Sequence, residues 1–342
     1  MIKLAVDAMG GDHAPLAVLE GVEKALQTFS DIGIVLYGDP SKVDLSQLAE
    51  EVSDRVELVE TLEVIEGEDE PVKAIRRKKD ASMVVAARAV KEGECQALIS
   101  AGNTGALLAA GLLIVGRMKG IDRPGLMPVI PTVNAESPQF ILMDAGANAD
   151  SKPEHLIQHA HLANFYAKAV LKLDCPRIGL LNNGTEAGKG DELRKAVYEV
   201  LSQDQELNFI GNIEAKELLS GKIDIALTDG FTGNAILKTL EGTAKSIFKV
   251  LKQTLTTSGL VTKLGALLIK KSLKDMAENF DDTKQGGAVL LGVKQAVIKA
   301  HGSSNGEAIF NAIRQARTIA ASGVVDQIRD YFESENIRQQ EG

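Results

Sequence analysis

The chain has 342 residues, of which 44% are hydrophobic and 25% are charged. This composition is typical of a soluble globular protein, and the length is sufficient for a large buried core. The net charge of -9 and an aromatic content of 4%, with no tryptophan, argue against a nucleic-acid-binding protein, because such proteins usually present basic and aromatic side chains.

Short apolar runs alternate with amphipathic segments along the chain. The expected strands are residues 3–8, 33–37, 56–59, 97–100, 127–132, 140–144, 177–181, 208–211, 223–228 and 297–300. The expected helices are residues 15–28, 71–91, 105–119, 153–172, 191–202, 231–255 and 306–322. Apolar strands separated by helices are typical of a mostly parallel sheet covered on both faces. We therefore expect one α/β domain over residues 1–333, a three-layer αβα sandwich, followed by a frayed polar tail at 334–342.

The segment from about 235 to 285 breaks this alternation, because helix-like sequence continues there without a convincing strand. Eight lysines lie between Lys238 and Lys274, against a single acid, Glu241. Residues 260–271 are apolar with lysine borders, a composition typical of an interfacial membrane anchor. A helical arm that buries its apolar face in a dimer, with solvated lysines, explains the same pattern. The two interpretations are compatible, and we place the dimer first.

The cysteines, the first residues and the lengths of the apolar stretches are those expected of a cytosolic protein. Cys95 and Cys175 have no metal-binding or redox spacing and are expected to be reduced thiols. Met1 runs directly into the first expected strand, without a secretory signal. No apolar stretch reaches the roughly 20 residues of a membrane span.

Two loops, at residues 100–105 and 228–233, share the pattern Ser/Thr-x-Gly-x-Thr-Gly. Each follows an apolar strand and precedes a helix, so its backbone N–H groups and threonine hydroxyls can bind an anion at the helix N-terminus. An ordinary helix cap would explain a single loop. The repetition favours two anionic groups, or one anion held from both sides. Neither loop matches a named nucleotide-binding motif.

Other polar residues follow expected strands, at the sheet edge where parallel sheets bind their ligands. Asp7 lies at the end of the first strand and His13 in the turn that follows it, although a capped turn explains them equally well. Asn183 and Lys189 belong to a donor-rich loop at 182–190, and His301 follows the strand at 297–300. These residues favour a site that holds an anion and lets it react directly.

Covalent catalysis and metal binding are not indicated. The sequence lacks a Gly-x-Ser-x-Gly nucleophile elbow, and neither cysteine lies in a glycine-rich loop. His155 and His159 are four residues apart, but no glutamate or cysteine completes a metal motif, so we expect core or surface histidines. We predict no metal and no cofactor.

Seven motifs resemble, in order, those of the PlsX family of bacterial phosphate acyltransferases. They are residues 5–15, 99–106, 120–124, 144–148, 152–156, 227–234 and 299–304. The resemblance implies an enzyme that converts acyl-[acyl carrier protein] and inorganic phosphate into acyl phosphate, which passes to a membrane glycerol-3-phosphate acyltransferase. It also implies a homodimer that associates peripherally with the membrane. The implied fold is similar to those of isocitrate/isopropylmalate dehydrogenases and phosphotransacetylases.

Combined with the loop pattern, the resemblance assigns roles to individual residues. The expected phosphate-binding residues are Ser100, Gly102, Asn103, Thr104, Gly105, Asn183, Thr232, Gly233 and Asn234. The expected catalytic residues are Asp7, His13, Lys189, Asp229 and His301. Two basic runs are expected to bind the acidic carrier protein, lipid or both: Arg76, Arg77, Lys78 and Lys79, and Lys263, Lys270 and Lys271.

Three alternatives use the same features differently. A phosphotransacetylase-like enzyme would take an acyl-coenzyme A in place of the carrier protein. A membrane-recruited scaffold for lipid synthesis would use the loops only as helix caps. A dehydrogenase would need the dinucleotide-binding glycine pattern, which the sequence lacks.

Overall fold

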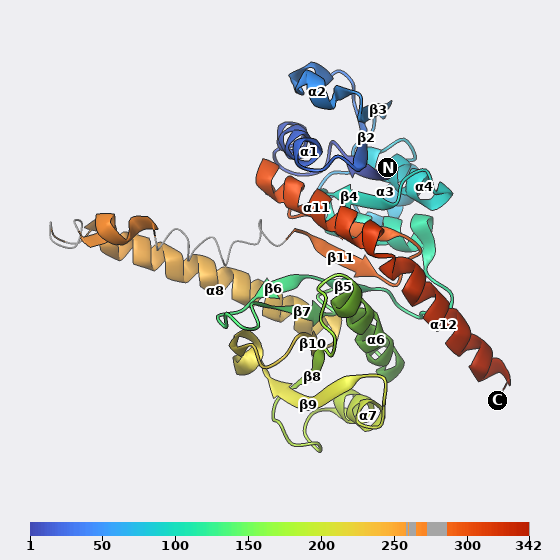
Figure 1. Ribbon diagram of the computed structural model, residues 1–342, viewed down its shortest axis with the longest axis vertical. Coiled ribbons are helices and arrows are strands. Elements are labelled where there is room, and N and C mark those ends of the chain that lie inside the picture. Colours follow the sequence, from blue (N-terminus) through green and yellow to red (C-terminus); the bar gives the residue numbers. More distant parts are fainter. Residues whose placement is uncertain (258, 260–264, 272–285, 342) are drawn as a thin grey trace.

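The strands form two mostly parallel sheets, stacked one above the other in Figure 1. The computed structural model describes residues 1–257, 259, 265–271 and 286–341, with side chains through residue 336. The first sheet has the order β3-β2-β1-β4-β12-β11-β5 and the second has the order β6-β7-β10-β8-β9. The strands of the first sheet are β1 Ile2–Asp7, β2 Ile32–Gly38, β3 Val56–Glu60, β4 Ala97–Ser100, β5 Gly125–Met127, β11 Ala288–Leu291 and β12 Ala296–Lys299. Those of the second are β6 Val129–Pro131, β7 Gln139–Met143, β8 Arg177–Asn182, β9 Asn208–Glu214 and β10 Ile225–Leu227.

Helices cover both faces of each sheet, which confirms the predicted α/β class. The helices are α1 Leu16–Thr28, α2 Glu50–Ser53, α3 Pro71–Arg77, α4 Ser82–Glu92, α5 Thr104–Ala110, α6 Pro153–Ala169, α7 Glu192–Leu201, α8 Gly230–Thr257, α11 Gly306–Ser322 and α12 Val324–Glu341. Successive side chains of a strand point to opposite faces. Accordingly, Leu4 and Val6 of β1 pack with α1 and α11, whereas Ala5 packs with α4 and α5.

Two segments that were each expected to be one element are divided. The expected strand at 127–132 becomes β5 in the first sheet and β6 in the second, with Pro128 between them. The expected helix at 71–91 becomes α3 and α4. The interruption lets the backbone at Ala81 bridge to Glu63, and it places the Ser82 hydroxyl beside Asp7 at the end of β1.

Two helix ends also differ from expectation. The expected helix at 105–119 is α5 followed by a π-helix, η2 Gly111–Gly116, and it ends at Gly116 with a φ of 93°. A left-handed backbone there favours glycine and stops the helix. The tail at 334–342 was expected to be frayed, but α12 continues to Glu341.

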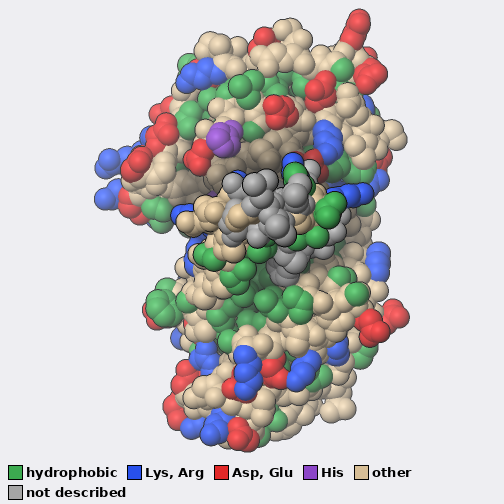
Figure 2. Space-filling model, turned by 90° about the vertical axis from the view of Figure 1, so that its left-hand side faces the viewer, with side chains coloured by type: hydrophobic (Ala, Val, Ile, Leu, Met, Phe, Trp, Pro, Cys, Tyr) green, Lys and Arg blue, Asp and Glu red, His purple; other side chains and the backbone are tan. Residues whose placement is uncertain are grey.

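Helix α8 is longer than the other helices in Figure 1 and extends away from the two sheets. Beyond it, residues 265–271 are again helical, while the remainder of the expected arm, including Lys263, lies outside the described residues. Viewed from the end of this arm, hydrophobic side chains gather in the middle of the face, with Lys and Arg side chains around them (Figure 2). Within the described ranges, none of the helices is both long and apolar enough to cross a bilayer.

Candidate active site

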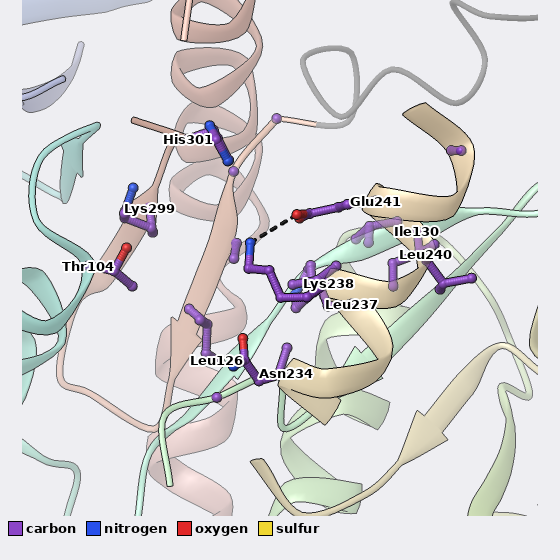
Figure 3. A pocket seen from close by; sticks show the side chains of 18 of the residues that line it. Thr104, Leu126, Ile130, Asn234, Leu237, Lys238, Leu240, Glu241, Lys299 and His301 are labelled. Atoms are coloured by element: carbon purple, nitrogen blue, oxygen red, sulfur yellow. Dashed lines mark hydrogen bonds and ion pairs between the residues drawn. The ribbon is translucent and has the colours of Figure 1, made fainter. Parts of the chain in front are cut away.

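A cavity of about 770 Å³ lies between the elements of the two sheets, beside the first turns of α8 (Figure 3). Most of its wall is apolar and comes from β5, β6 and α8, including Leu126, Ile130, Leu237, Leu240, Ile247 and Phe248. The polar side chains that line it are Thr104, Asn234, Lys238, Glu241, Thr243, Lys299 and His301. A cleft of this size with an apolar wall and a few polar groups is typical of a small-molecule site.

The polar side chains come from both sides of the cavity. Figure 3 shows Thr104, Lys299 and His301 on the side of the first sheet, with Lys238 extending toward them from α8. The Lys238 ammonium group pairs with Glu241 at 2.9 Å, one helical turn along α8. The apolar side chains Ile130, Leu237 and Leu240 lie on the opposite side of Lys238. The cavity therefore has a cationic, hydrogen-bonding end and an apolar remainder.

The first Gly/Thr loop is held in place by the Asp7 carboxylate. Its Oδ2 accepts a hydrogen bond from Ser100 Oγ at 2.7 Å, and its Oδ1 accepts one from Ser82 Oγ at 2.6 Å. Ser100 Oγ in turn accepts from the Gly102 N–H at 3.0 Å. Burial raises the pKa of Asp7, although the hydroxyl and backbone N–H donors oppose the shift. Asp7, Ser100 and Gly102 thus fix the path of the loop.

Asn103 caps the helix that follows the first loop. Its Oδ1 accepts from the Ala106 N–H at 3.0 Å, and its Nδ2 donates to backbone carbonyls of residues 66–69. The side chain is therefore used within the fold, whereas the next two residues, Thr104 and Gly105, line the cavity. An added Cβ at Gly105 would lie 2.6 Å from the ring of Pro71, so the α3–α5 contact needs glycine there.

The second Gly/Thr segment, residues 228–233, runs into the first turn of α8, which begins at Gly230, and it is organised around Asp229. Its Oδ1 accepts from the Thr232 N–H at 2.9 Å, and its Oδ2 pairs with the Arg194 guanidinium at 2.6 Å. Burial by itself would raise the pKa of Asp229, but the hydrogen bonds from Thr232 and the charge of Arg194 outweigh it, so the pKa lies below the ordinary value. The sequence analysis missed Arg194, which contacts this loop from α7.

Glycine 233 allows α8 to approach the turn after β7. An added Cβ at Gly233 would lie 1.9 Å from the backbone oxygen of Asp144. The buried Asp144 carboxylate organises that turn by accepting the N–H groups of Leu126, Gly146 and Ala147 at 2.9–3.0 Å. Packed in this way, α8 presents Asn234 to the cavity.

Of the other residues expected in the site, one lines the cavity and three lie outside it. His301 lines the cavity, and its Nδ1 accepts from the Ser303 N–H at 3.2 Å, so the neutral ring carries its proton on Nε2. His13, Asn183 and Lys189 are exposed and lie outside the set of described residues that line the cavity. Of the described His, Cys, Asp and Glu side chains, no three are placed to hold a metal ion together.

The expected partner-binding residues are mostly exposed. Arg76, Arg77 and Lys79 face solvent, but Lys78 pairs with Asp69 and donates to the Val64 carbonyl at 2.8 Å. Lys270 and Lys271 are exposed on the helical segment 265–271.

Lys299 is a cavity residue to which the sequence analysis gave no role. It ends β12, two residues before His301, and burial together with the nearby Lys238 charge lowers the pKa of its ammonium group to about 8. The only signal in the sequence was its place in the motif at 299–304. A lysine at the end of an apolar strand does not by itself indicate whether its ammonium group is buried.

The sequence is similar to those of known proteins over nearly its whole length. Residues 2–327 match a family model described as fatty acid synthesis protein. The chain is 56% identical over 336 residues to a phosphate acyltransferase of Streptococcus equi subsp. zooepidemicus (strain H70), covering 98% of this chain and 99% of that protein. It is 55% identical over 337 residues to a phosphate acyltransferase of Streptococcus uberis, with 98% and 99% coverage.

Solved structures share the fold at low sequence identity. A branched-chain phosphotransacylase from Enterococcus faecalis V583 aligns with a TM-score of 0.59 and 19% identity, covering 94% of this chain and 99% of that chain. A phosphotransacetylase from Streptococcus pyogenes aligns with a TM-score of 0.58 and 13% identity, covering 95% and 94%. At these identities the similarity shows the fold alone.

Proposed function

The chain belongs to the fatty acid synthesis protein family, with phosphate acyltransferases as its relatives, and from this premise we propose that the cavity joins an acyl group to inorganic phosphate. The product is an acyl phosphate that feeds phospholipid synthesis. The observation that carries the proposal is the division of the cavity into a cationic end and an apolar remainder. The apolar part suits an acyl chain, and the cationic end suits phosphate.

The reaction needs positioning more than strong acid–base catalysis. An oxygen of hydrogen phosphate attacks the thioester carbonyl carbon and forms a new C–O bond. The C–S bond then breaks, and the proton of hydrogen phosphate ends on the departing sulfur. Because a thiolate is a good leaving group, catalysis rests on holding the two reactants together and stabilising the oxyanion. Thr104 and His301 supply hydrogen-bonding groups at the cationic end, and Asn234 supplies a further one in the cavity wall.

We assign the acyl donor to an acyl carrier protein. Carrier proteins are acidic, and the exposed cations Arg76, Arg77 and Lys79 offer complementary charge that would steer such a partner. Lys270 and Lys271 offer a second basic surface on the arm. A coenzyme A thioester remains the alternative donor.

The arm is assigned to contact with a second copy of the chain and with the membrane surface. Side chains of Ile247 and Val250 on α8 are 61% and 62% exposed, and Leu268 is 87% exposed. Exposed apolar side chains in a row along a protruding helix favour such contacts. In this proposal the protein works in the cytoplasm, at the membrane, close to the glycerol-3-phosphate acyltransferase that uses its product.

The test is thioester cleavage with and without inorganic phosphate. Palmitoyl-carrier protein and palmitoyl-coenzyme A are compared as donors, and acyl phosphate is measured directly. Phosphate-dependent acyl phosphate formation that prefers the carrier protein is the expected result. Preference for coenzyme A would favour the phosphotransacetylase-like alternative. Absence of turnover with either donor would contradict the enzymatic assignment.

A further inference from the structure

Lys299 lines the cavity, and its ammonium group has no opposite charge paired with it in the part of the chain that the structure describes. Its Nζ donates to the Ala300 carbonyl, and among the described residues no carboxylate forms an ion pair with it. Lys238 adds a second positive charge from α8, whereas Asp12 opposes the pKa shift from the loop after β1. Burying an ammonium group without a paired charge costs stability. Such costly groups concentrate at functional sites.

The surroundings of Lys299 indicate what it binds. Thr104 and His301 line the same end of the cavity, and β12 lies beside β4 with Lys299 opposite Ser100. The nearby Lys238 is already paired with Glu241. A lysine binds phosphate as a point charge that needs no fixed geometry. An acyl chain would gain nothing from a charge, and the apolar wall accommodates it elsewhere.

We propose that Lys299 binds the attacking phosphate through its ammonium group and holds it beside Thr104 and His301. In this arrangement Lys299, and not the exposed Lys189, supplies the positive charge to the phosphate. The proposal rests on the proposed function, because that function makes phosphate a substrate. It adds the residue that supplies the positive charge.

The first experiment measures phosphate binding without any acyl donor, so it does not depend on turnover. Inorganic phosphate is titrated into the full-length protein and into K299M by calorimetry. We expect K299M to bind phosphate at least about tenfold more weakly, since a hydrogen bond to a charged group is lost. The control is K294M, an exposed lysine in the turn between β11 and β12, which should change affinity by less than about twofold. Equal binding by wild type and K299M overturns the proposal.

Steady-state kinetics and thermal unfolding of K299M distinguish a role of Lys299 in phosphate binding from a structural role. We expect K299M to raise the KM for phosphate by about tenfold or more and to leave the KM for the acyl donor within about twofold. At pH 7 the half-buried ammonium group is charged, so K299M should unfold at the same temperature or higher. A lower unfolding temperature together with an unchanged phosphate KM would show that Lys299 is structural.

The variant K299R tests the charge itself. As pH rises through about 8, Lys299 loses its proton, so the wild-type affinity for phosphate should fall in that range. Arginine stays protonated there, so K299R should lack this decline. Lys238, Glu241 and His301 line the cavity with Lys299, and Asp12 acts on its charge from the loop after β1; all four are unchanged in both proteins. A wild type that binds phosphate but makes no acyl phosphate would contradict the proposed function and leave the Lys299 assignment standing.

Discussion

The two Gly/Thr loops share a sequence pattern but differ in the charge of the residue before the helix. Before α5 that residue is Asn103, a neutral cap, and the adjacent Thr104 and Gly105 line the cavity. Before α8 it is Asp229, whose carboxylate accepts the Thr232 N–H and pairs with Arg194. A helix N-terminus that already faces a carboxylate attracts a second anion less strongly. One pattern therefore serves two purposes, a ligand surface at α5 and internal packing at α8.

The packing role of the α8 loop is tested most strongly by G233A. The new Cβ would overlap the backbone oxygen of Asp144, which cannot move without disturbing the turn after β7. We expect a loss of about 3 kcal/mol or more in the free energy of unfolding, measured by urea denaturation. The matched control is G242A on the same helix, where nothing lies within 4 Å of the new Cβ. It should gain about 0.5–1 kcal/mol, because alanine favours a helix over glycine. Similar losses in both variants would contradict the packing role.

Removal of Arg194 should have the next largest effect. R194Q leaves the Asp229 carboxylate buried without its cation, and we expect a loss of about 3 kcal/mol at pH 7. The Asp229 pKa is lowered in the folded protein, so its stabilising contribution is present above the ordinary aspartate pKa and is lost as pH falls through the folded value. The difference between wild type and R194Q should therefore shrink below about pH 4.

The neighbouring exposed residue Lys195 provides the control for Arg194. Lys195 pairs with Glu192 only at 3.6 Å, so K195Q should change stability by less than about 0.5 kcal/mol. If R194Q destabilises equally at all pH values, Asp229 is not the partner that matters.

The threonines distinguish the two loops by function. T104V removes a hydroxyl from the cavity wall, and we expect the KM for phosphate to rise by about tenfold, equivalent to roughly 1.4 kcal/mol. Thr232 Oγ1 lies 3.4 Å from the Arg194 guanidinium instead, so T232V should change stability by about 1 kcal/mol and the phosphate KM little. Steady-state kinetics and thermal unfolding of both variants check this contrast. A higher phosphate KM in T232V would restore an anion-binding role for the second loop.

The cap before α5 is expected to have an effect similar in size to that of the threonines. N103A removes a helix cap and the hydrogen bonds to residues 66–69, and we expect a loss of about 1–2 kcal/mol. N305A removes only a cap, at the start of α11, and should cost about 1 kcal/mol. Amide hydrogen exchange should become faster at residues 66–70 in N103A but not in N305A. Unchanged exchange there would show that the cap alone accounts for the loss.

Local sequence determined most of the elements and the position of both loops. Apolar runs such as residues 97–99 encode buried strands, and amphipathic segments such as α8 and α11 encode helices, because periodicity and burial act over a few neighbouring residues. Both Gly/Thr patterns were located at a junction between a strand and a helix for the same reason, although α5 begins at Thr104 and α8 at Gly230, so each pattern ends inside its helix. The division of 127–132 between two sheets was not predictable, since a short apolar run carries no information about which strand it will pair with.

Only the tertiary structure decided what each polar side chain contacts. Asp7 meets Ser82 and Ser100, which are 75 and 93 residues away, and Asp229 meets Arg194 from a different helix. Lys299 became a cavity residue because the first sheet brings β12 beside β4, opposite the start of α8. The energy of a buried charge depends on the groups that surround it in space. For that reason the sequence determined the secondary elements and the loops, and the packing of the two sheets determined which of their residues form the site.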